Sequence, residues 1–502
     1  MKRRSLAAAT VAVIVAAGAW ASLAAQTAVD WPRASPPGPL AARSVDFPPY
    51  EIRTLPNGLR VLVVLWHEQP SVSFRLLVRA GAAEEPADRP GVASFVSSLL
   101  EQGTTTKSAV DIANTIDAAG GMLGVGSGNE LTSIYGAVVK DRTALALGLV
   151  ADLVEHPAFA DDEIQRQRNQ ALSALQVAYD DPDYIAGLVF DRLVFGLHPY
   201  GRPNEGTRTS IGRITRADLL AFHQTWFAPN NALLAIVGDL SANEAFAAAA
   251  RAFGDWERRD VPAVAAPAPP PPAPHVVVID RPGSAQTEIR VGHLGISRTD
   301  PDYVPFDLAI RILGGEGANR LFGVLRSDRG LTYGASAELR AYKTSGEVMA
   351  ETETRTAATG ESLRLMVNEF DRLQRETVGS TELEGAQDFV AGNFPLSMES
   401  PSSIAEQVLS RLFYGQSPDG IERYVDDVQD VTADDVLRVS RTLLHPEALT
   451  IVLVGDASAF VDQLHANGFD TFDRIPLSDL DVDAVALRRT ESMTGVSSRL
   501  VP

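Results

Sequence analysis

No cysteine occurs anywhere in the 502 residues of this chain. That absence excludes a disulfide framework, thiolate metal ligands and a cysteine nucleophile. Aromatic residues are also few, at 7%, whereas apolar residues as a whole make up 45% and charged residues 22%. Such a balance is typical of a globular protein, and the chain is longer than one hydrophobic core usually serves. The composition therefore predicts two domains that are stabilised by burial alone.

A basic surface is the second feature that the sequence lacks. The formal net charge is −20, and the basic residues of the N-terminal segment make the remainder more acidic still. Nucleic acids and anionic membranes bind basic surfaces, so the charge argues against both as partners. An acidic surface is compatible with cationic peptides as ligands, and it equally serves solubility.

Residues 1–25 have the pattern of a secretory signal peptide. A basic start precedes an apolar run from Leu6 to Trp20, and small residues are placed for cleavage near Ala24 or Ala25. An uncleaved anchor is the alternative, but the run is shorter than the ~20 residues that a spanning helix needs. We expect an exported protein, periplasmic or secreted, without stable membrane insertion after cleavage.

The remaining chain divides at a Pro- and Ala-rich linker, residues 261–275, which favours a semi-rigid extended spacer. The halves on either side look like copies. Thr215 and Thr432 each open an amphipathic helix, and Gly238 and Gly455 each end a buried strand; both pairs are 217 residues apart. Markers on one diagonal indicate an internal duplication.

Each half predicts an α+β fold. The first opens with a hairpin that turns at Pro56-Asn57-Gly58, and a strand and a helix from about Pro90 follow. Strands that are grouped before and between pairs of helices favour an antiparallel-rich sheet with helices packed on one face.

Duplication and fold class together set the expected domains. We expect a first domain at 45–260, a second domain at 276–475, and a C-terminal tail at 476–502. The tail has weak periodicity, which predicts either disorder or docking on a partner.

Six segments carry a resemblance to a known family. They are the NGLRV hairpin, RPGVASF, DDEIQRQR followed by DDP, HPYGRPNEGT, the unit from ADLLAFHQTWFAPNN to VGD, and LFGVLRSDRGLTYG. In these segments and their order the chain resembles the pitrilysin or insulinase-type (inverzincin) metallopeptidases, which include both subunits of mitochondrial processing peptidase. The resemblance implies two domains that form half of a clamshell.

Catalytic members of that family carry H-x-x-E-H on the helix after the G-x-A-type start, where two histidines bind zinc and the glutamate polarises water. The resemblance places these three positions at Ser94, Ser97 and Ser98, and the third ligand at Ala174. Gln167 stands at the supporting acidic position. The expectation is a degenerate site: no metal or cofactor bound by this chain, with zinc in a partner subunit.

A serine nucleophile and a zinc site elsewhere in the chain are the alternatives. No G-x-S-x-G elbow surrounds the three serines, so a serine nucleophile lacks support. None of the eight histidines shares a helix face with another, which leaves a non-local zinc site as the open alternative. His198, in the HPYG turn, fits a structural turn residue better than a ligand.

The second half keeps a pair that the family uses. Arg326 and Tyr333 lie seven residues apart in LFGVLRSDRGLTYG. The resemblance implies that they reach a zinc site, hold the substrate backbone and stabilise the developing oxyanion, because a guanidinium and a phenol both donate to a carbonyl oxygen. The structural alternative is a helix C-terminal arginine and an ordinary strand aromatic.

Gly314, Gly315 and Gly317 lie where the non-catalytic subunit of mitochondrial processing peptidase has a longer glycine-rich loop. No lysine follows in P-loop register, so a phosphate cradle is not indicated. A tight helix N-terminus fits the segment better.

The predicted function follows from two observations: the second half has the Arg/Tyr pair, and the first half lacks the zinc ligands. We expect a non-catalytic subunit of a secreted heterodimeric zinc metallopeptidase, paired with a homologous subunit that bears H-x-x-E-H and acting on peptide substrates. The alternative is a proteolytically inactive scaffold or peptide-binding protein of the same fold. An autonomous peptidase with another mechanism has no motif behind it.

Overall fold

The computed structural model describes residues 47–263, 266–315 and 319–489. The predicted signal peptide, part of the linker, Gly317 and the last part of the predicted tail lie outside these residues. Within the described ranges, no helix combines the length and the apolar character that a membrane crossing requires.

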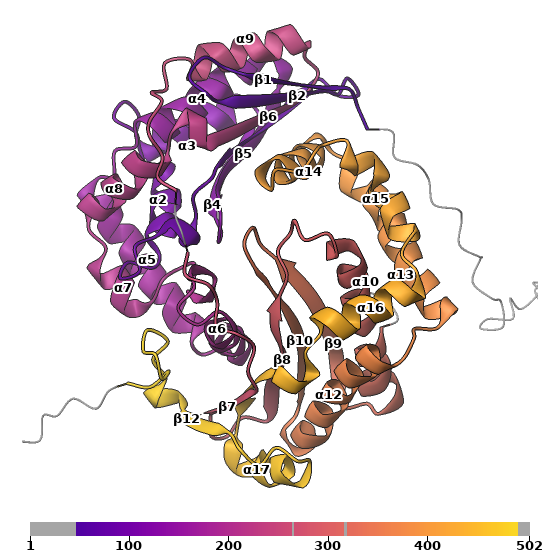
Figure 1. Cartoon of the computed structure of the whole chain (residues 1–502). Helices are drawn as coiled ribbons and strands as arrows, with labels where there is room; N and C mark the ends of the chain where they lie inside the picture. Colours follow the sequence, from indigo (N-terminus) through magenta and orange to yellow (C-terminus); the bar gives the residue numbers. More distant parts are fainter. Residues whose placement is uncertain (1–46, 264–265, 316–318, 490–502) are drawn as a thin grey trace, which may run out of the picture. The chain divides into compact units, whose positions relative to one another are not determined.

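Two six-stranded sheets, one from each half, organise the described chain (Figure 1). The first contains β1 (Tyr50–Thr54), β2 (Arg60–Leu65), β3 (Ser71–Val78), β4 (Met122–Ser127), β5 (Thr132–Val139) and β6 (Ala232–Gly238). The second contains β7 (His275–Asp280), β8 (Gln286–Gly295), β9 (Thr332–Ala341), β10 (Gly346–Arg355), β11 (Thr450–Gly455) and β12 (Asp473–Pro476).

The strand order repeats. It is β1-β2-β6-β3-β5-β4 in the first sheet and β12-β7-β11-β8-β10-β9 in the second, so five strands match one to one. In both sheets one of these neighbouring pairs is parallel, β2 with β6 and β7 with β11, and the others are antiparallel. Only the edge differs, because β1 pairs antiparallel with β2 whereas β12 pairs parallel with β7. The predicted duplication and the antiparallel-rich sheets are confirmed.

The helices repeat in the same way. The first half contains α2 (Val92–Leu100), α3 (Ala109–Ala118), α4 (Thr143–Glu155), α5 (Asp161–Ala178), α6 (Pro182–Phe195), α7 (Arg208–Arg213), α8 (Arg216–Trp226) and α9 (Ala242–Phe253). The second contains α10 (Tyr303–Gly314), α11 (Arg320–Phe322), α12 (Thr359–Arg375), α13 (Ser380–Asn393), α14 (Pro401–Phe413), α15 (Gly420–Gln429), α16 (Ala433–Leu443) and α17 (Ala457–Ala466). Thr215 and Thr432 cap α8 and α16 through matching capping boxes, with Asp218 and Asp435 as their partners.

Each sheet packs one face on helices of its own half, as predicted. On the first sheet α2, α4 and α9 pack around Val61, Val63 and Ile236. On the second sheet α10, α12, α16 and α17 pack around Ile451 and Leu453. The side chains that alternate with these point to the opposite faces, which are also apolar, so the central strands are buried on both sides.

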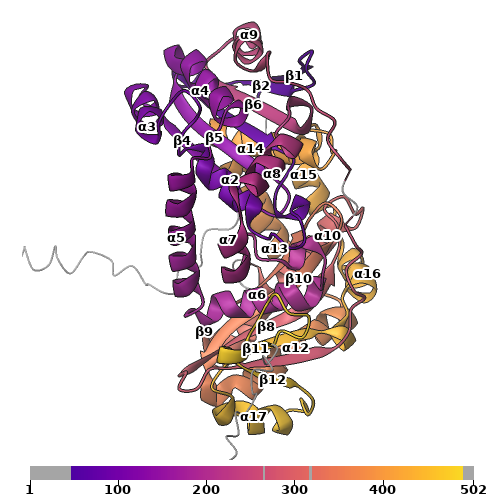
Figure 2. The ribbon, with the colours of Figure 1, turned by 90° about the vertical axis from the view of Figure 1, so that its left-hand side faces the viewer.

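A helix from the other half covers each opposite face. Helix α6 packs Ile185, Val189 and Phe190 against Val452 and Val454 of the second sheet. Helix α14 packs Ile404, Val408 and Leu409 against the first sheet, where Leu62, Val64 and Val237 lie. Both views show α6 beside β8 (Figure 2). The sequence did not predict this exchange, because an apolar helix face does not specify which sheet it meets.

The described part of the predicted tail packs on its own chain. Leu480, Val482 and Leu487 are buried in the core under α6, and the Asp483 carboxylate accepts a hydrogen bond from the Thr207 hydroxyl at 2.8 Å. Residues 477–489 are therefore ordered on their own chain rather than disordered, and docking of the tail on a partner stays a prediction. Three apolar side chains within eight residues are enough to hold a segment that has little regular structure.

Candidate functional site

The start of α2 is held by a buried carboxylate and by two glycines. Glu85 is 6% exposed and accepts the backbone N–H groups of Gly91 and Ala93 at 2.9 and 2.7 Å. Gly91 has φ +95°, and a Cβ there would lie 2.9 Å from the Cα of Gly206. The backbone of the RPG segment therefore packs directly against the backbone of the NEGT segment. This contact sets the position and direction of α2.

Burial raises the pKa of Glu85 to about 8, against the effect of its two N–H donors. Because the unfolded carboxyl titrates near its ordinary value, the folded state holds the extra proton between these two pKa values, and stability falls as the pH rises toward 8. The buried histidines His223 and His293 have pKa values lowered to about 4, so they oppose this trend only below about pH 6.5.

We therefore expect the free energy of unfolding to fall from pH 6.5 to pH 8.5, and the Glu85→Gln variant to lose about 2 kcal/mol less than the wild type over that interval. Urea denaturation at the two pH values measures the difference. Glu384→Gln, an exposed carboxyl on α13, is the matched control and should behave as the wild type. Equal pH dependence in the wild type and Glu85→Gln would contradict the assignment.

The three serines of α2 satisfy their hydroxyls within the helix where they bond at all. The Ser97 hydroxyl donates to the Ser94 carbonyl at 2.8 Å, and the Ser98 hydroxyl donates to the Phe95 carbonyl at 3.0 Å. Ser97 is buried, whereas Ser94 and Ser98 are half-buried. These contacts are ordinary back-bonding of serine in a helix and organise no nucleophile.

The position expected for the third ligand lies on α5 and points outward. Ala174 is exposed, and the neighbouring Leu175 is the residue that packs on the core. Gln167 is half-buried on the same helix. Three hydroxyls and a methyl group offer no imidazole or carboxylate, so the residues at these positions do not fit zinc.

Elsewhere in the described part of the chain, no three His, Asp or Glu side chains gather closely enough to hold a metal ion. His198 is 3% exposed, and its Nδ1 accepts the Tyr200 N–H at 3.2 Å. That contact caps the short helical turn Pro199–Gly201 and agrees with a structural role.

Arg326 and Tyr333 come together at the surface of the second half. Arg326 lies in the π-helical segment Gly323–Asp328, Gly330 turns the chain with φ +61°, and Tyr333 is the second residue of β9. The Arg326 guanidinium lies 5.7 Å from the centre of the Tyr333 ring, and the Tyr333 side chain is 91% exposed. A cation and a phenol are thus presented side by side to the outside of the chain.

The glycine-rich segment serves a close approach where it is described. A Cβ on Gly314 would lie 2.2 Å from the backbone nitrogen of Ala337, so the end of α10 lies directly against β9. Asn319 then caps α11 by accepting the Phe322 N–H at 2.7 Å. The Asn319 cap agrees with the predicted helix N-terminus, whereas the Gly314 contact belongs to the C-terminal end of α10.

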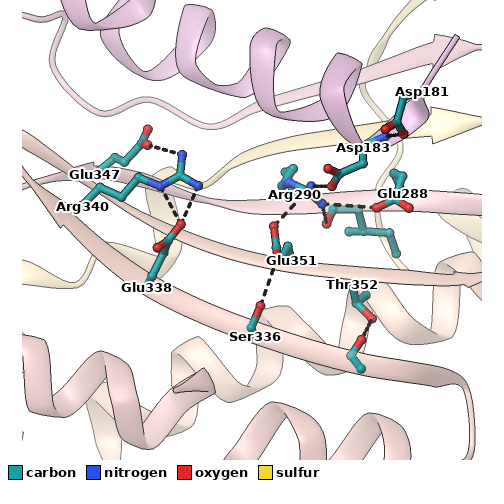
Figure 3. Close-up of polar contacts among 12 residues, drawn as sticks. Asp181, Asp183, Glu288, Arg290, Ser336, Glu338, Arg340, Glu347, Glu351 and Thr352 are labelled. Carbon is teal, nitrogen blue, oxygen red and sulfur yellow. Dashed lines mark hydrogen bonds and ion pairs between the residues drawn. The ribbon is translucent and has the colours of Figure 1, made fainter. Parts of the chain in front are cut away.

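Sequence reasoning missed a polar network on the second sheet (Figure 3). Arg290 is 3% exposed and pairs with Asp183 of α6, with Glu288 at 3.3 Å and with Glu351 at 3.2 Å. The network borders a cavity of about 930 Å³. Glutamates at alternate positions of β10 were the available signal, since period two places them on one face.

A second guanidinium extends the network toward α6. Arg340 pairs with Glu338 at 2.5 Å and with the fully buried Glu347 at 3.3 Å (Figure 3). Glu347 is also close to Asp191 of α6, and burial raises the pKa of both carboxyls. The Asp191 charge raises the pKa of Glu347 further, whereas the hydrogen bond with Glu347 lowers that of Asp191. The carboxyls outnumber the guanidinium groups here, so this face of the second sheet is acidic.

Comparison with known proteins finds one protein family over both halves of the chain. The family "Insulinase (Peptidase family M16)" matches residues 60–207, and "Peptidase M16 inactive domain" matches residues 213–390. An uncharacterized zinc protease of Mycobacterium tuberculosis is 30% identical over 417 residues, which cover 82% of this chain and 94% of that protein. An uncharacterized zinc protease of Bacillus subtilis is 23% identical and covers 78% of this chain and 94% of its own length.

Solved structures agree. The peptidase M16 inactive domain from Pseudomonas fluorescens superimposes with a TM-score of 0.77 at 30% identity and covers 81% of this chain and 98% of its own. A protease from Helicobacter pylori has a TM-score of 0.76 at 19% identity, with coverage of 82% and 100%, which shows the shared fold.

Proposed function

Because the chain belongs to peptidase family M16, we propose that it is the non-catalytic subunit of a secreted, heterodimeric zinc metallopeptidase. The partner would be a homologous subunit that carries H-x-x-E-H and the zinc ion. This chain would supply Arg326 and Tyr333 to the partner's active site and a wall to the peptide-binding chamber.

The observation that carries the proposal is the state of the Arg326/Tyr333 pair. Both side chains are exposed, and in the described part of the chain neither has an ion-pair or hydrogen-bond partner for its polar atoms. At such exposed positions the donors face water, which a group of another chain can replace. Their free donors are available to a group outside the chain.

The chemistry fits peptide cleavage by the partner. A scissile carbonyl oxygen gains negative charge as water attacks, and donors placed at that oxygen lower the barrier. The Arg326 fork can hold the oxygen or a neighbouring peptide carbonyl, and the Tyr333 hydroxyl can donate a second hydrogen bond. Neither residue needs to gain or lose a proton to do this.

The second candidate is a proteolytically inactive scaffold or peptide-binding protein. Serines at positions 94, 97 and 98 and alanine at 174 favour it as much as they favour the heterodimer, because both roles dispense with zinc in this chain. The two candidates differ in the role of Arg326 and Tyr333: in the heterodimer they act in the partner's active site, and in the scaffold they do not.

The first experiment is a pull-down of the tagged mature protein from the exported fraction, with mass spectrometry of what co-purifies. We expect a stoichiometric companion with H-x-x-E-H, and peptide cleavage by the pair that a chelator stops and that neither chain shows alone. Sequencing of the mature N-terminus should place it near residue 25. A lone protein without cleavage would favour the scaffold, and a cytoplasmic protein with its first 25 residues intact would contradict export.

A further inference from the structure

The second half contains a pocket of about 590 Å³ that the proposed function does not use. Helices α10, α13, α14 and α15 line it, together with the segment before α10 that contains Arg298. Its size lies within the range of small-molecule sites. The pocket is distinct from the Arg326/Tyr333 pair, which is not among its lining residues.

Guanidinium groups converge on this pocket in a chain that is otherwise strongly acidic. Arg298 and Arg411 both line it, and neither forms an ion pair with a carboxylate of the described residues. Arg298 instead donates to the Tyr303 hydroxyl and lies over that ring at 4.0 Å. Arg311 also lines the pocket and is paired with Asp307 at 2.9 Å.

The two unpaired arginines are close enough to repel each other. Burial lowers the pKa of Arg411, and the neighbouring Arg298 lowers it further. Asp427 is the one carboxylate of the pocket lining, and it is exposed. Partly buried like charges destabilise the fold unless an anion neutralises them, so the arrangement points to an external counter-charge.

The other residues that line the pocket indicate the chemical character of the rest of the ligand. Phe389, Phe394 and Tyr424 give apolar and aromatic walls, and Phe394 and Tyr424 pack with ring centres 4.8 Å apart. Neutral donors and acceptors, Gln407 and Ser410 among them, lie on the α14 side. An apolar wall beside planar cationic forks suits an anion that carries an apolar or aromatic body.

The repeat gives the pocket a place in the fold. By element order α10, α13, α14 and α15 correspond to α2, α5, α6 and α7 of the first half, the helices around the degenerate zinc positions. The pocket in the second half therefore lies in the region that corresponds, helix for helix, to the region around the degenerate zinc positions in the first half. In the second half this region is lined by arginine.

We propose that this pocket binds a small organic anion, a carboxylate or phosphate group on an apolar or aromatic body, with Arg298 and Arg411 holding the anionic group. Because charge holds the anionic group, binding should weaken as the salt concentration rises.

Isothermal titration of the full mature chain tests the site with two probes, phenyl phosphate and N-acetylphenylalanine. We expect one or both to bind with a Kd of about 1 mM or lower, given their size. Binding of the phosphate alone identifies a phosphorylated ligand, and binding of the carboxylate alone identifies a free carboxyl terminus or organic acid. If neither probe produces a binding heat at about ten times that concentration, the proposal is overturned.

Variants locate the binding. Arg411→Met keeps most of the side-chain volume and should weaken binding at least about tenfold, and Arg411→Lys should weaken it less because the charge remains without the fork. Arg298→Met is the second test if Arg411→Met fails to fold, as judged by circular dichroism. Arg441→Met removes an exposed arginine of α16 outside the pocket and should bind as the wild type. Equal affinity of Arg411→Met and Arg441→Met overturns the proposal.

Discussion

A complex that contains the Tyr333→Phe variant is expected to cleave peptide about 10²–10³-fold more slowly than the wild-type complex, with assembly unchanged. The substitution removes one hydroxyl from a side chain that is 91% exposed, so it leaves the fold of this subunit intact. In the proposed function, the hydroxyl that it removes donates to the carbonyl oxygen of the substrate. The loss should therefore fall on kcat, because the donor acts most strongly when the oxygen becomes charged.

Arg326→Ala should reduce cleavage by a similar factor, and Arg326→Lys should restore part of it, since a lysine keeps the charge but not the planar fork. Arg329→Ala is the matched control: Arg329 lies three residues away, is exposed and pairs with Glu361 at 3.3 Å. Tyr135→Phe removes a second exposed phenol in the first half and serves the same purpose for Tyr333.

Size-exclusion chromatography of each variant with the partner separates the possible results. Full assembly with reduced cleavage supports completion of the active site. Full assembly with wild-type cleavage in both Tyr333→Phe and Arg326→Ala would contradict it and leave the scaffold role.

Phe190→Ala is expected to lower the free energy of unfolding by about 3–5 kcal/mol. The Phe190 ring is fully buried between α6 and the second sheet, and the Cβ of any larger residue at Gly292 would lie 3.0 Å from it. The sheet has thus left room for this ring, and an alanine would leave a cavity there. Leu197→Ala, just after α6 and 64% exposed, should change stability by less than about 0.5 kcal/mol.

The helix exchange makes this measurement informative about cooperativity. All five tryptophans lie in the first 256 residues, so their fluorescence reports on the first half, whereas far-ultraviolet circular dichroism reports on both. Because α6 belongs to the first half and packs on the second sheet, we expect the two signals to change together in urea, in Phe190→Ala as in the wild type. Separate transitions for the two signals in the wild type would show that the exchanged helices do not couple the halves.

Local signals predicted much of the fold. Thr215 and Thr432 mark equivalent helix starts because a capping box depends on four consecutive residues, and strands β6 and β11 are visible as continuous apolar runs. The strand order of each sheet could be expected only through the family resemblance. Neither the exchange of α6 and α14 nor the packing of Leu480 and its neighbours could be read from periodicity, because burial of a face does not name its partner.

One candidate site could be predicted from local sequence and the other could not. Arg326 and Tyr333 are seven residues apart in the sequence, and the intervening turn at Gly330 brings them into contact, so spacing was sufficient to find them. Arg298 and Arg411 are more than a hundred residues apart and meet only through the packing of α10, α14 and α15. Their proximity depends on the tertiary structure, so no local sequence pattern could predict it.

The reciprocal exchange of α6 and α14 also has a historical meaning. Two copies of one unit, each lending the same helix to the other's sheet, have the arrangement of a domain-swapped homodimer whose subunits became joined end to end. A half-length ancestor would have been stable only as a pair, since either unit alone exposes an apolar sheet face. Fusion lets the two copies diverge, and the sequences of α2 and α10 in this chain now differ almost throughout.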